Sequence, residues 1–180
     1  MGACIPLFTW ISLMTDNVRH AIKIHSESGY KVEDIELLEI AAHLFLKHLH
    51  TVAPIPPIQC EIVITNIVNS DSISEPLNGD MEEIKIVDSD NGLRYYLCRL
   101  ADYTNSAETM RTLAHELTHV WQAANGSLSI NEDNEWFWCG ESYGINPYNG
   151  TNDDLLLPWE AEADTLDLQL VKQFYNTYFS

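Results

Sequence analysis

One stretch decides how this chain is organised: Thr112-Leu113-Ala114-His115-Glu116-Leu117-Thr118-His119-Val120-Trp121-Gln122. It contains the pattern His-Glu-x-x-His, in which His115 and His119 are four residues apart. In an α-helix, residues four apart lie one turn above each other on the same face. The two imidazoles would therefore point to a single position, with Glu116 beside it. Two neutral imidazoles, a third ligand and an open water position are typical of a catalytic zinc site, and an adjacent carboxylate can accept a proton from that water.

The residues around this motif predict where its helix begins and ends. Asn105 and Glu108 fit a capping box at the amino end, and Asn125-Gly126 is a typical stop signal at the carboxyl end. His115 lies about 200° round the helix from Leu113, at about 100° per residue. Leu113 belongs to an apolar stripe at helical spacing, formed by Met110, Leu113, Leu117, Trp121 and Ala124. We therefore expect one face of the helix to pack on a sheet while the opposite face presents the histidines.

An acidic helix, predicted from residue 158 onward, offers candidates for the third ligand. Pro158 suits the first turn of a helix, and Glu160 and Asp164 share one face of it because they are four residues apart. One of them could bind the metal while the other accepts a hydrogen bond from a ligand histidine. We rank Glu160 first as the ligand, followed by Glu162 and Asp164, and Cys139 is a more remote alternative.

A simpler interpretation of the same residues needs no metal. An acidic first turn could do no more than complement the dipole of its helix. His115 and His119 could likewise be two exposed side chains on a solvated helix face. The sequence alone leaves this alternative open.

The rest of the chain predicts a mixture of helices and strands. We expect helices at 16–24 and 31–50, and strands at 58–67, 83–87 and 93–100. A polar turn at 88–92 would join the last two strands into a hairpin. Residues 127–157 are rich in aromatic side chains and long for a connection, with a short strand or hairpin at 135–143.

These elements indicate a single α+β domain that spans residues 1–180. The longer predicted helix, 31–50, would pack against the core as a backing helix. The domain would consist of an apolar amino-terminal segment (1–15), helices and a sheet (16–104), the active-site helix (105–126), an aromatic loop or hairpin (127–157) and the third-ligand helix (158–180).

The net charge excludes some classes of partner. The chain has 180 residues and a formal charge of −18, from nine Lys and Arg against 27 Asp and Glu. Such a charge repels phosphate backbones and anionic lipids, so it argues against binding to nucleic acids and membrane surfaces. The first fourteen residues are apolar, but they lack the basic start and cleavage site of a secretory signal and are too short to span a bilayer. We therefore expect a cytoplasmic protein, and secretion stays open.

The four cysteines contain no CxxC pair, so they do not indicate a thiolate zinc site. We expect free, partly buried thiols rather than disulfides. Cys4, in the apolar amino-terminal segment, could cap a metal ion and so make that segment inhibitory.

The motif residues resemble those of a known group of enzymes. The pattern His115-Glu116-x-x-His119, followed by Glu160 and Asp164, is similar to that of the gluzincin zinc metallopeptidases, and the size is similar to that of the compact minigluzincins. The resemblance implies that Glu160 is the third zinc ligand and that Asp164 supports a ligand histidine. It also implies a zincin-like α+β fold, in which a small, mostly antiparallel sheet packs on the active-site helix and a backing helix. The carboxyl-terminal helix would supply the third ligand.

The resemblance also implies how a substrate would bind. In such a fold an edge strand holds an extended peptide by backbone pairing, and residues 93–100 are the candidate for that edge. The chain has no room for the helical subdomain of larger gluzincins. It also lacks a clear match to the Tyr or His that stabilises the oxyanion there: Tyr143 and Tyr148 are available, but we expect both to be packing residues.

The predicted function is therefore a Zn²⁺-dependent metallopeptidase that hydrolyses peptide or protein substrates, with Glu116 as the general base. The alternative is a zinc-binding regulatory or interaction protein on the same fold, with weak or no activity. A DNA-associated protease with the same helix motif is a further rival, but the net charge of −18 argues against it.

Overall fold

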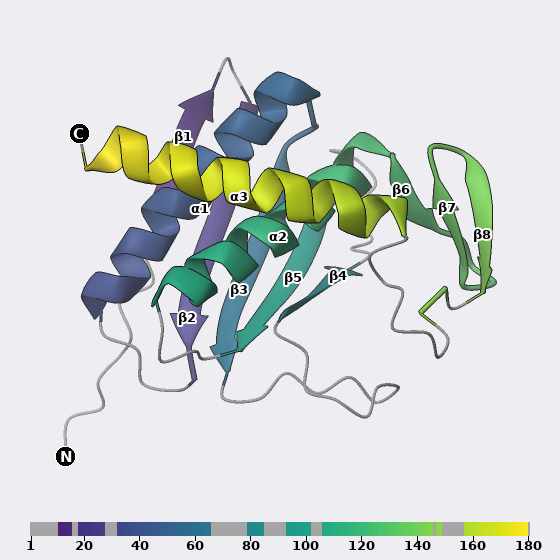
Figure 1. The fold of residues 1–180 in the computed structure, drawn as a ribbon, viewed down its shortest axis with the longest axis horizontal. Helices are drawn as coiled ribbons and strands as arrows, with labels where there is room; N and C mark the ends of the chain where they lie inside the picture. Colours follow the sequence, from purple (N-terminus) through teal and green to yellow (C-terminus); the bar gives the residue numbers. More distant parts are fainter. Residues whose placement is uncertain are drawn as a thin grey trace.

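The structure, a computed structural model shown in Figure 1, describes residues 11–15, 18–27, 32–65, 79–84, 93–101, 106–145, 147–148 and 157–179. Within these residues the chain forms three helices and two β-sheets, so the predicted α+β class is confirmed. The predictions made for Cys4, for the capping residue Asn105 and for the turn at 88–92 lie outside the described residues.

The larger sheet is mixed, which makes the prediction of a mostly antiparallel sheet wrong. In spatial order its strands are β1 (Ile11–Thr15), β2 (Val18–Ser26), β3 (Ile58–Thr65), β5 (Arg94–Ala101) and β4 (Gly79–Ile84). β2, β3 and β5 run parallel, whereas the outer strands β1 and β4 are antiparallel to their neighbours. Helix α1 (Val32–Val52) connects β2 to β3. A helical crossover returns the chain to the same end of the sheet, so the two strands it joins are parallel.

Strand β2 occupies residues for which the sequence predicted a short helix at 16–24. Its buried residues His20, Ile22 and Ile24 alternate with partly exposed ones, which is the period of a strand. Isoleucine also favours this conformation, because its branched Cβ packs well on a pleated surface. Had this alternation been interpreted as a strand, the chain would have read as strand, helix, strand over β2, α1 and β3. That order predicts a parallel pair of strands.

The predicted edge strand at 93–100 is an inner strand, because β5 lies between β3 and β4. The edge is β4, which pairs with β5 from Gly79 opposite Leu100 to Ile84 opposite Tyr95. The antiparallel pairing predicted between 83–87 and 93–100 is confirmed at Glu83 and Ile84, and residues 85–87 lie outside the described part of the chain. β4 also packs against α2 (Ser106–Asn125), the helix that carries the His-Glu-x-x-His motif.

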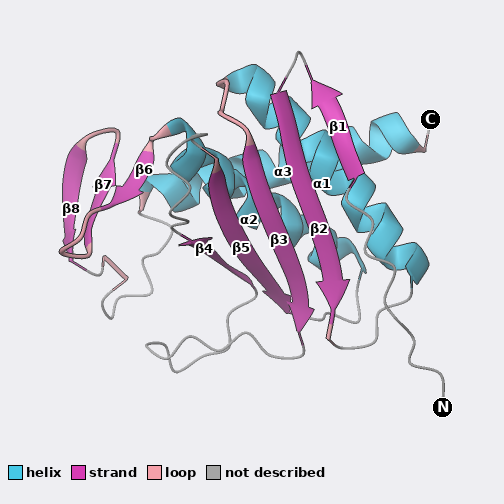
Figure 2. Cartoon of the chain, turned by 180° about the vertical axis from the view of Figure 1, so that it is seen from behind, coloured by secondary structure: helices cyan, strands magenta, loops and turns pink. Residues whose placement is uncertain are grey.

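All three helices lie on the same face of the five-stranded sheet, as Figures 1 and 2 show from opposite sides. α1 and α2 contact the sheet, and α3 (Pro158–Tyr178) packs across both of them. The core joins buried side chains of β2, β3 and β5 with those of the helices. Leu113 and Leu117, from the predicted apolar stripe, are completely buried in it. The opposite side of α2 thus faces α3, which brings the two halves of the proposed site together.

A small second sheet follows α2 and carries the aromatic residues. Its strands are β6 (Leu128–Ile130), β7 (Glu135–Trp138) and β8 (Glu141–Ile145), in that order and antiparallel. Of the two alternatives predicted for 135–143, a short strand or a hairpin, the structure has the hairpin, with its turn at Cys139 and Gly140. Cys139 and Gly140 both have positive φ angles, of 50° and 87°, as a two-residue turn between antiparallel strands requires.

Three cysteines lie in the described residues, Cys60, Cys98 and Cys139, and none of them is in a disulfide there; Sγ of Cys60 lies 3.8 Å from Sγ of Cys98. Cys60 and Cys98 are buried, whereas Cys139 is exposed in the turn between β7 and β8. Among the described residues, none of the helices has both the length and the apolar character needed to cross a bilayer.

Candidate metal centre

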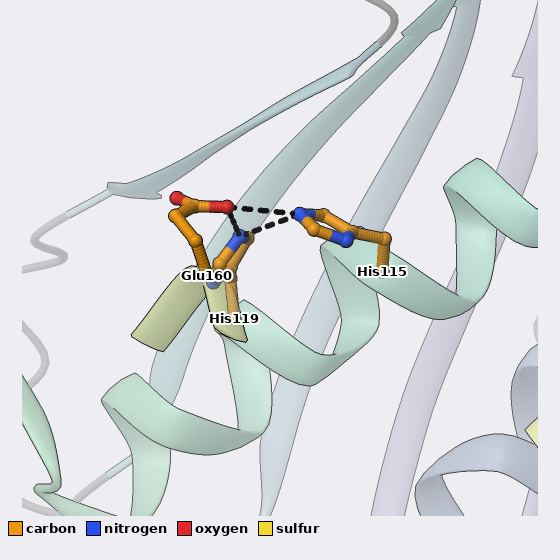
Figure 3. A group of neighbouring side chains, drawn as sticks. All are labelled: His115, His119 and Glu160. Atoms are coloured by element: carbon orange, nitrogen blue, oxygen red, sulfur yellow. Dashed lines mark hydrogen bonds and ion pairs between the residues drawn. The ribbon is translucent and has the colours of Figure 1, made fainter. Parts of the chain in front are cut away.

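Two consecutive turns of α2 present His115 and His119 to the same position, as their spacing predicts. Nε2 of His115 lies 3.1 Å from Nε2 of His119. Helix α3 begins at Pro158, so Glu160 lies in its first turn, directly against these two rings. Oε2 of Glu160 is 3.1 Å from Nε2 of His115 and 3.4 Å from Nε2 of His119. Figure 3 shows the three side chains converging from the two helices.

The spacing of these three atoms fits a zinc ion. A tetrahedral zinc site has metal–ligand distances of about 2.0–2.1 Å, which place neighbouring ligand atoms about 3.3–3.4 Å apart. The observed separations of 3.1, 3.1 and 3.4 Å are close to this value. Two histidines and one glutamate are also a ligand set known for catalytic zinc. The residues present therefore fit the metal that the sequence predicts.

The electrostatics of the site favour positive charge. Burial on its own lowers the pKa of His115, but the carboxylates of Asp167 and Glu160 outweigh it and raise that pKa to about 10. The pKa of His119 is also raised, because Glu160 and Glu116 outweigh the effect of burial. Burial alone would raise the pKa of Glu160, but the two histidines hold it well below its usual range. The site therefore favours a metal cation. Without a metal, protons occupy the histidines, and a metal that binds must displace them.

Glu116, which directly follows His115 in α2, is a buried carboxylate. Its side chain belongs to the buried part of α2, with 5% of the residue exposed. It is close enough to both rings for its charge to raise the pKa values of His115 and His119. It contributes in the same way to the raised pKa of Tyr148. The Glu116 carboxylate therefore lies within electrostatic range of His115, His119 and Tyr148.

The other acidic candidates for the third ligand lie further away. Glu162 points to Gln122, whose Nε2 donates to its Oε2 at 3.0 Å. Oδ1 of Asp164 lies 3.5 Å from Nδ1 of His115, on the far side of that ring from Nε2. Cys139, in the exposed turn between β7 and β8, belongs to neither group of potential metal ligands found among the described residues. The geometry therefore favours Glu160 as the third ligand and Asp164 as a residue that supports His115.

A second carboxylate near His115 was missed by the sequence interpretation. Asp167, one turn after Asp164 in α3, is 1% exposed, and its Oδ2 lies 3.7 Å from Nδ1 of His115. Nε of Arg111 donates to the same oxygen at 3.0 Å. These contacts explain why His115, Asp164 and Asp167 form a further group of potential ligands. Arg111 already supplies a cation there, so we assign this group to orienting His115. The spacing of three residues between Asp164 and Asp167 is the signal that could have predicted it.

Tyr148 packs on Trp136 and Trp159, as expected, but it also belongs to the site. Its hydroxyl donates to Oε1 of Glu160 at 2.5 Å, and Nε1 of Trp159 donates to that hydroxyl at 2.8 Å. Trp159 is completely buried and lies at the centre of an aromatic cluster. Its ring is stacked with that of Trp136 at 5.6 Å, and Tyr143 contacts it edge-on at 5.2 Å. The second sheet thus supports the helix turn that holds Glu160.

These assignments rest on the residues and their geometry. No family model matches the chain, and comparisons with curated proteins and with solved structures find no match either. The function is therefore argued from the chemistry of the site.

Proposed function

We propose that this chain is a Zn²⁺-dependent metallopeptidase of the gluzincin type, with a zincin-like fold, that acts on peptide or protein substrates. One observation carries the proposal: Nε2 of His115, Nε2 of His119 and Oε2 of Glu160 converge from two helices to within 3.4 Å of one another. Three lone pairs that face each other this closely repel unless a cation or protons lie between them. The buried carboxylate of Glu116 beside them supports a hydrolytic site rather than a purely structural one.

Each residue of the centre has a distinct part in this proposal. Zinc held by His115, His119 and Glu160 would polarise the scissile carbonyl group and lower the pKa of a bound water towards neutrality. One carboxylate oxygen of Glu116 accepts the proton of the attacking water and returns it to the leaving amine. Asp164 and Asp167 keep the ring of His115 in place through its Nδ1 side.

Tyr148 is the group best placed to stabilise the developing oxyanion. Its hydroxyl already lies within hydrogen-bonding distance of a ligand carboxylate, so it is next to the reacting centre. When a substrate is bound, this O–H would have to turn from Glu160 to the substrate oxygen, where it would stabilise the negative charge more in the transition state than in the ground state. Tyr148 would thus fill the role for which the sequence offered no clear match.

Strand β4 is the candidate for substrate binding. It is one of the two outer strands of the sheet and is antiparallel to β5, and within the described residues it packs closely against α2, as β1 does not. An extended peptide can pair with such an edge through its backbone, which gives affinity without a strong demand on sequence. The role first assigned to residues 93–100 therefore passes to β4.

A digest of casein tests the proposed activity. The purified protein loaded with Zn²⁺ should cleave casein, lose this activity in a chelator and regain it when zinc is added back. A protein that carries stoichiometric zinc and leaves casein and a mixed peptide library intact would contradict the peptidase assignment.

The second candidate is a zinc-binding protein without efficient turnover. One observation favours it: the hydroxyl of Tyr148 is bound to Glu160, on the ligand side of the aromatic cluster around Trp159. If this contact persists when zinc is bound, the aromatic side chains would cover the centre rather than serve it. The casein digest separates the two candidates, because both bind zinc and only one hydrolyses peptides.

A further inference from the structure

The side chain of Gln122 connects the two helices that form the metal centre. It is completely buried, and it follows His119 by three residues, on the same face of α2. Its Oε1 lies 2.8 Å from Nδ1 of His119. Its Nε2 donates to the backbone oxygen of Trp159 at 2.9 Å and to Oε2 of Glu162 at 3.0 Å. All of these distances are those of ordinary hydrogen bonds.

The two acceptors on α3 determine the orientation of the Gln122 amide. The carbonyl of Trp159 and the carboxylate of Glu162 can only accept hydrogen bonds, so the NH₂ group of the amide must face them. The amide oxygen then faces His119. Because that oxygen carries no proton, Nδ1 of His119 must be the donor in the 2.8 Å contact.

This constraint selects one tautomer of a neutral His119. With its proton on Nδ1, the ring keeps its lone pair on Nε2, which is the nitrogen nearest to His115 and Glu160. Only a nitrogen with a free lone pair can bind a metal. The hydrogen bonds of Gln122 to α3 thus determine that Nε2 of His119 is the nitrogen with the free lone pair.

We propose that Gln122 is a positioning residue, which fixes the tautomer and the ring orientation of His119 as a metal ligand. This inference rests on the metal site proposed above. The same amide binds Trp159 and Glu162, which lie on either side of Glu160 in α3. Gln122 therefore sets His119 relative to the turn that supplies the third ligand. It also gives Glu162 a part in the site as an acceptor for Gln122 rather than as a ligand.

The variant Gln122→Met tests this role, because methionine has a similar length but offers no carbonyl oxygen to His119. Outer hydrogen-bond partners of ligand histidines typically change metal affinity by about 10–100-fold. We expect the zinc Kd of Gln122→Met, measured by competition with a chromophoric chelator, to rise by about that factor. The matched control is Gln173→Met, the same change at an exposed position of α3, which should stay within about threefold of the unsubstituted protein.

Thermal unfolding of the zinc-free proteins separates positioning from packing. If Gln122 only packs the two helices together, Gln122→Met lowers the melting temperature and leaves the zinc Kd of the folded protein unchanged, which overturns the inference. If Gln122→Met does not fold, nitrogen-15 NMR of the unsubstituted zinc-loaded protein decides. The inference predicts a slowly exchanging proton on Nδ1 of His119, and a rapidly exchanging one contradicts it.

Zinc binding distinguishes a wrong metal centre from a wrong role of Gln122. An unsubstituted protein that binds no zinc contradicts the metal centre and, with it, the role of Gln122. A protein that binds zinc equally well with and without Gln122 contradicts only the positioning role.

Discussion

The hydroxyl of Tyr148 donates a hydrogen bond of 2.5 Å to Oε1 of Glu160. The other oxygen of that carboxylate, Oε2, faces Nε2 of His115 and Nε2 of His119. The two oxygens of Glu160 therefore have separate surroundings: one faces the histidines, and the other is held by a phenol. Tyr148 is in turn held by Trp159, so the aromatic cluster fixes the ligand carboxylate from behind.

Substituting Tyr148 by phenylalanine should affect turnover more than metal binding. The histidine contacts of Glu160 remain in Tyr148→Phe, so we expect zinc affinity to fall by less than about tenfold. Loss of an oxyanion donor typically lowers kcat by about 10²–10³-fold, and we expect that loss with little change in KM. Peptide hydrolysis under steady-state conditions measures both constants. Tyr143→Phe is the matched control, because Tyr143 contacts Trp159 through its ring. Equal kcat values for the two variants would remove Tyr148 from the chemistry.

Substituting Glu116 by glutamine should separate metal binding from catalysis. The amide has nearly the same shape but cannot accept the proton of the attacking water, so activity should fall by at least about 10²-fold. The zinc content should stay at the level of the unsubstituted protein, as measured by metal analysis after dialysis. Glu108→Gln, at an exposed position of the same helix, is the control and should keep full activity. A Glu116→Gln protein that cleaves casein at the original rate would exclude Glu116 as the base.

Asp167 should matter more for zinc binding than Asp164. Its side chain is 2% exposed and tied to Arg111, whereas that of Asp164 is 35% exposed and accessible to water. Asp167→Asn should raise the zinc Kd by about 10–100-fold and destabilise the fold by about 1–3 kcal/mol, because it weakens a buried hydrogen-bonded ion pair. Asp164→Asn should have a smaller effect on both quantities. Chelator competition and chemical denaturation measure them, and the reverse order of the two variants would contradict this assignment.

The convergence of His115 and His119 was predictable because their spacing is local. The four-residue interval of His115 and His119 puts both rings on one face of a helix wherever that helix packs, and Pro158 marks the start of the helix that carries Glu160. The hairpin turn at Gly140 was predictable for the same reason, because its positive φ angle is a property of the turn itself.

The parts that the sequence did not predict depend on contacts between distant elements. Tyr148 bonds to Glu160 and packs on Trp136 of the second sheet, which is itself stacked on Trp159. The Gln122 amide acquires its orientation from acceptors on a helix almost forty residues further along the chain, at Trp159. The mixed sheet was missed for a different reason: Ile22 and Ile24 alternate with polar residues, and this short period-two pattern was interpreted as a helix.

His20 should make the fold sensitive to acid at a place remote from the metal centre. Burial lowers its pKa to about 4, and the neighbouring His50 and His43 act in the same direction. Neither ring nitrogen of His20 has a hydrogen-bond partner within the described part of the chain. A pKa that is lower in the folded protein than the ordinary 6.5 means that the unfolded chain binds the proton first. His20 therefore does not lower the free energy of unfolding above about pH 6.5. As the pH decreases towards 4, it lowers this free energy by up to about 3 kcal/mol.

The variant His20→Phe isolates this effect, because phenylalanine fills a similar volume and does not titrate. Urea denaturation at a series of pH values should show a shallower loss of stability between pH 6.5 and 4 in His20→Phe than in the unsubstituted protein. Parallel curves for the two proteins over this range would show that His20 does not cause the acid sensitivity.

The zinc stoichiometry of the purified protein tests the central claim most directly. It is measured by metal analysis after dialysis against a weak chelator, for the unsubstituted chain and for His115→Ala, His119→Ala and Glu160→Ala. The proposed centre predicts one zinc ion for each chain and almost none in any of the three variants. A protein without bound zinc, or three variants that keep it, would contradict the metal centre.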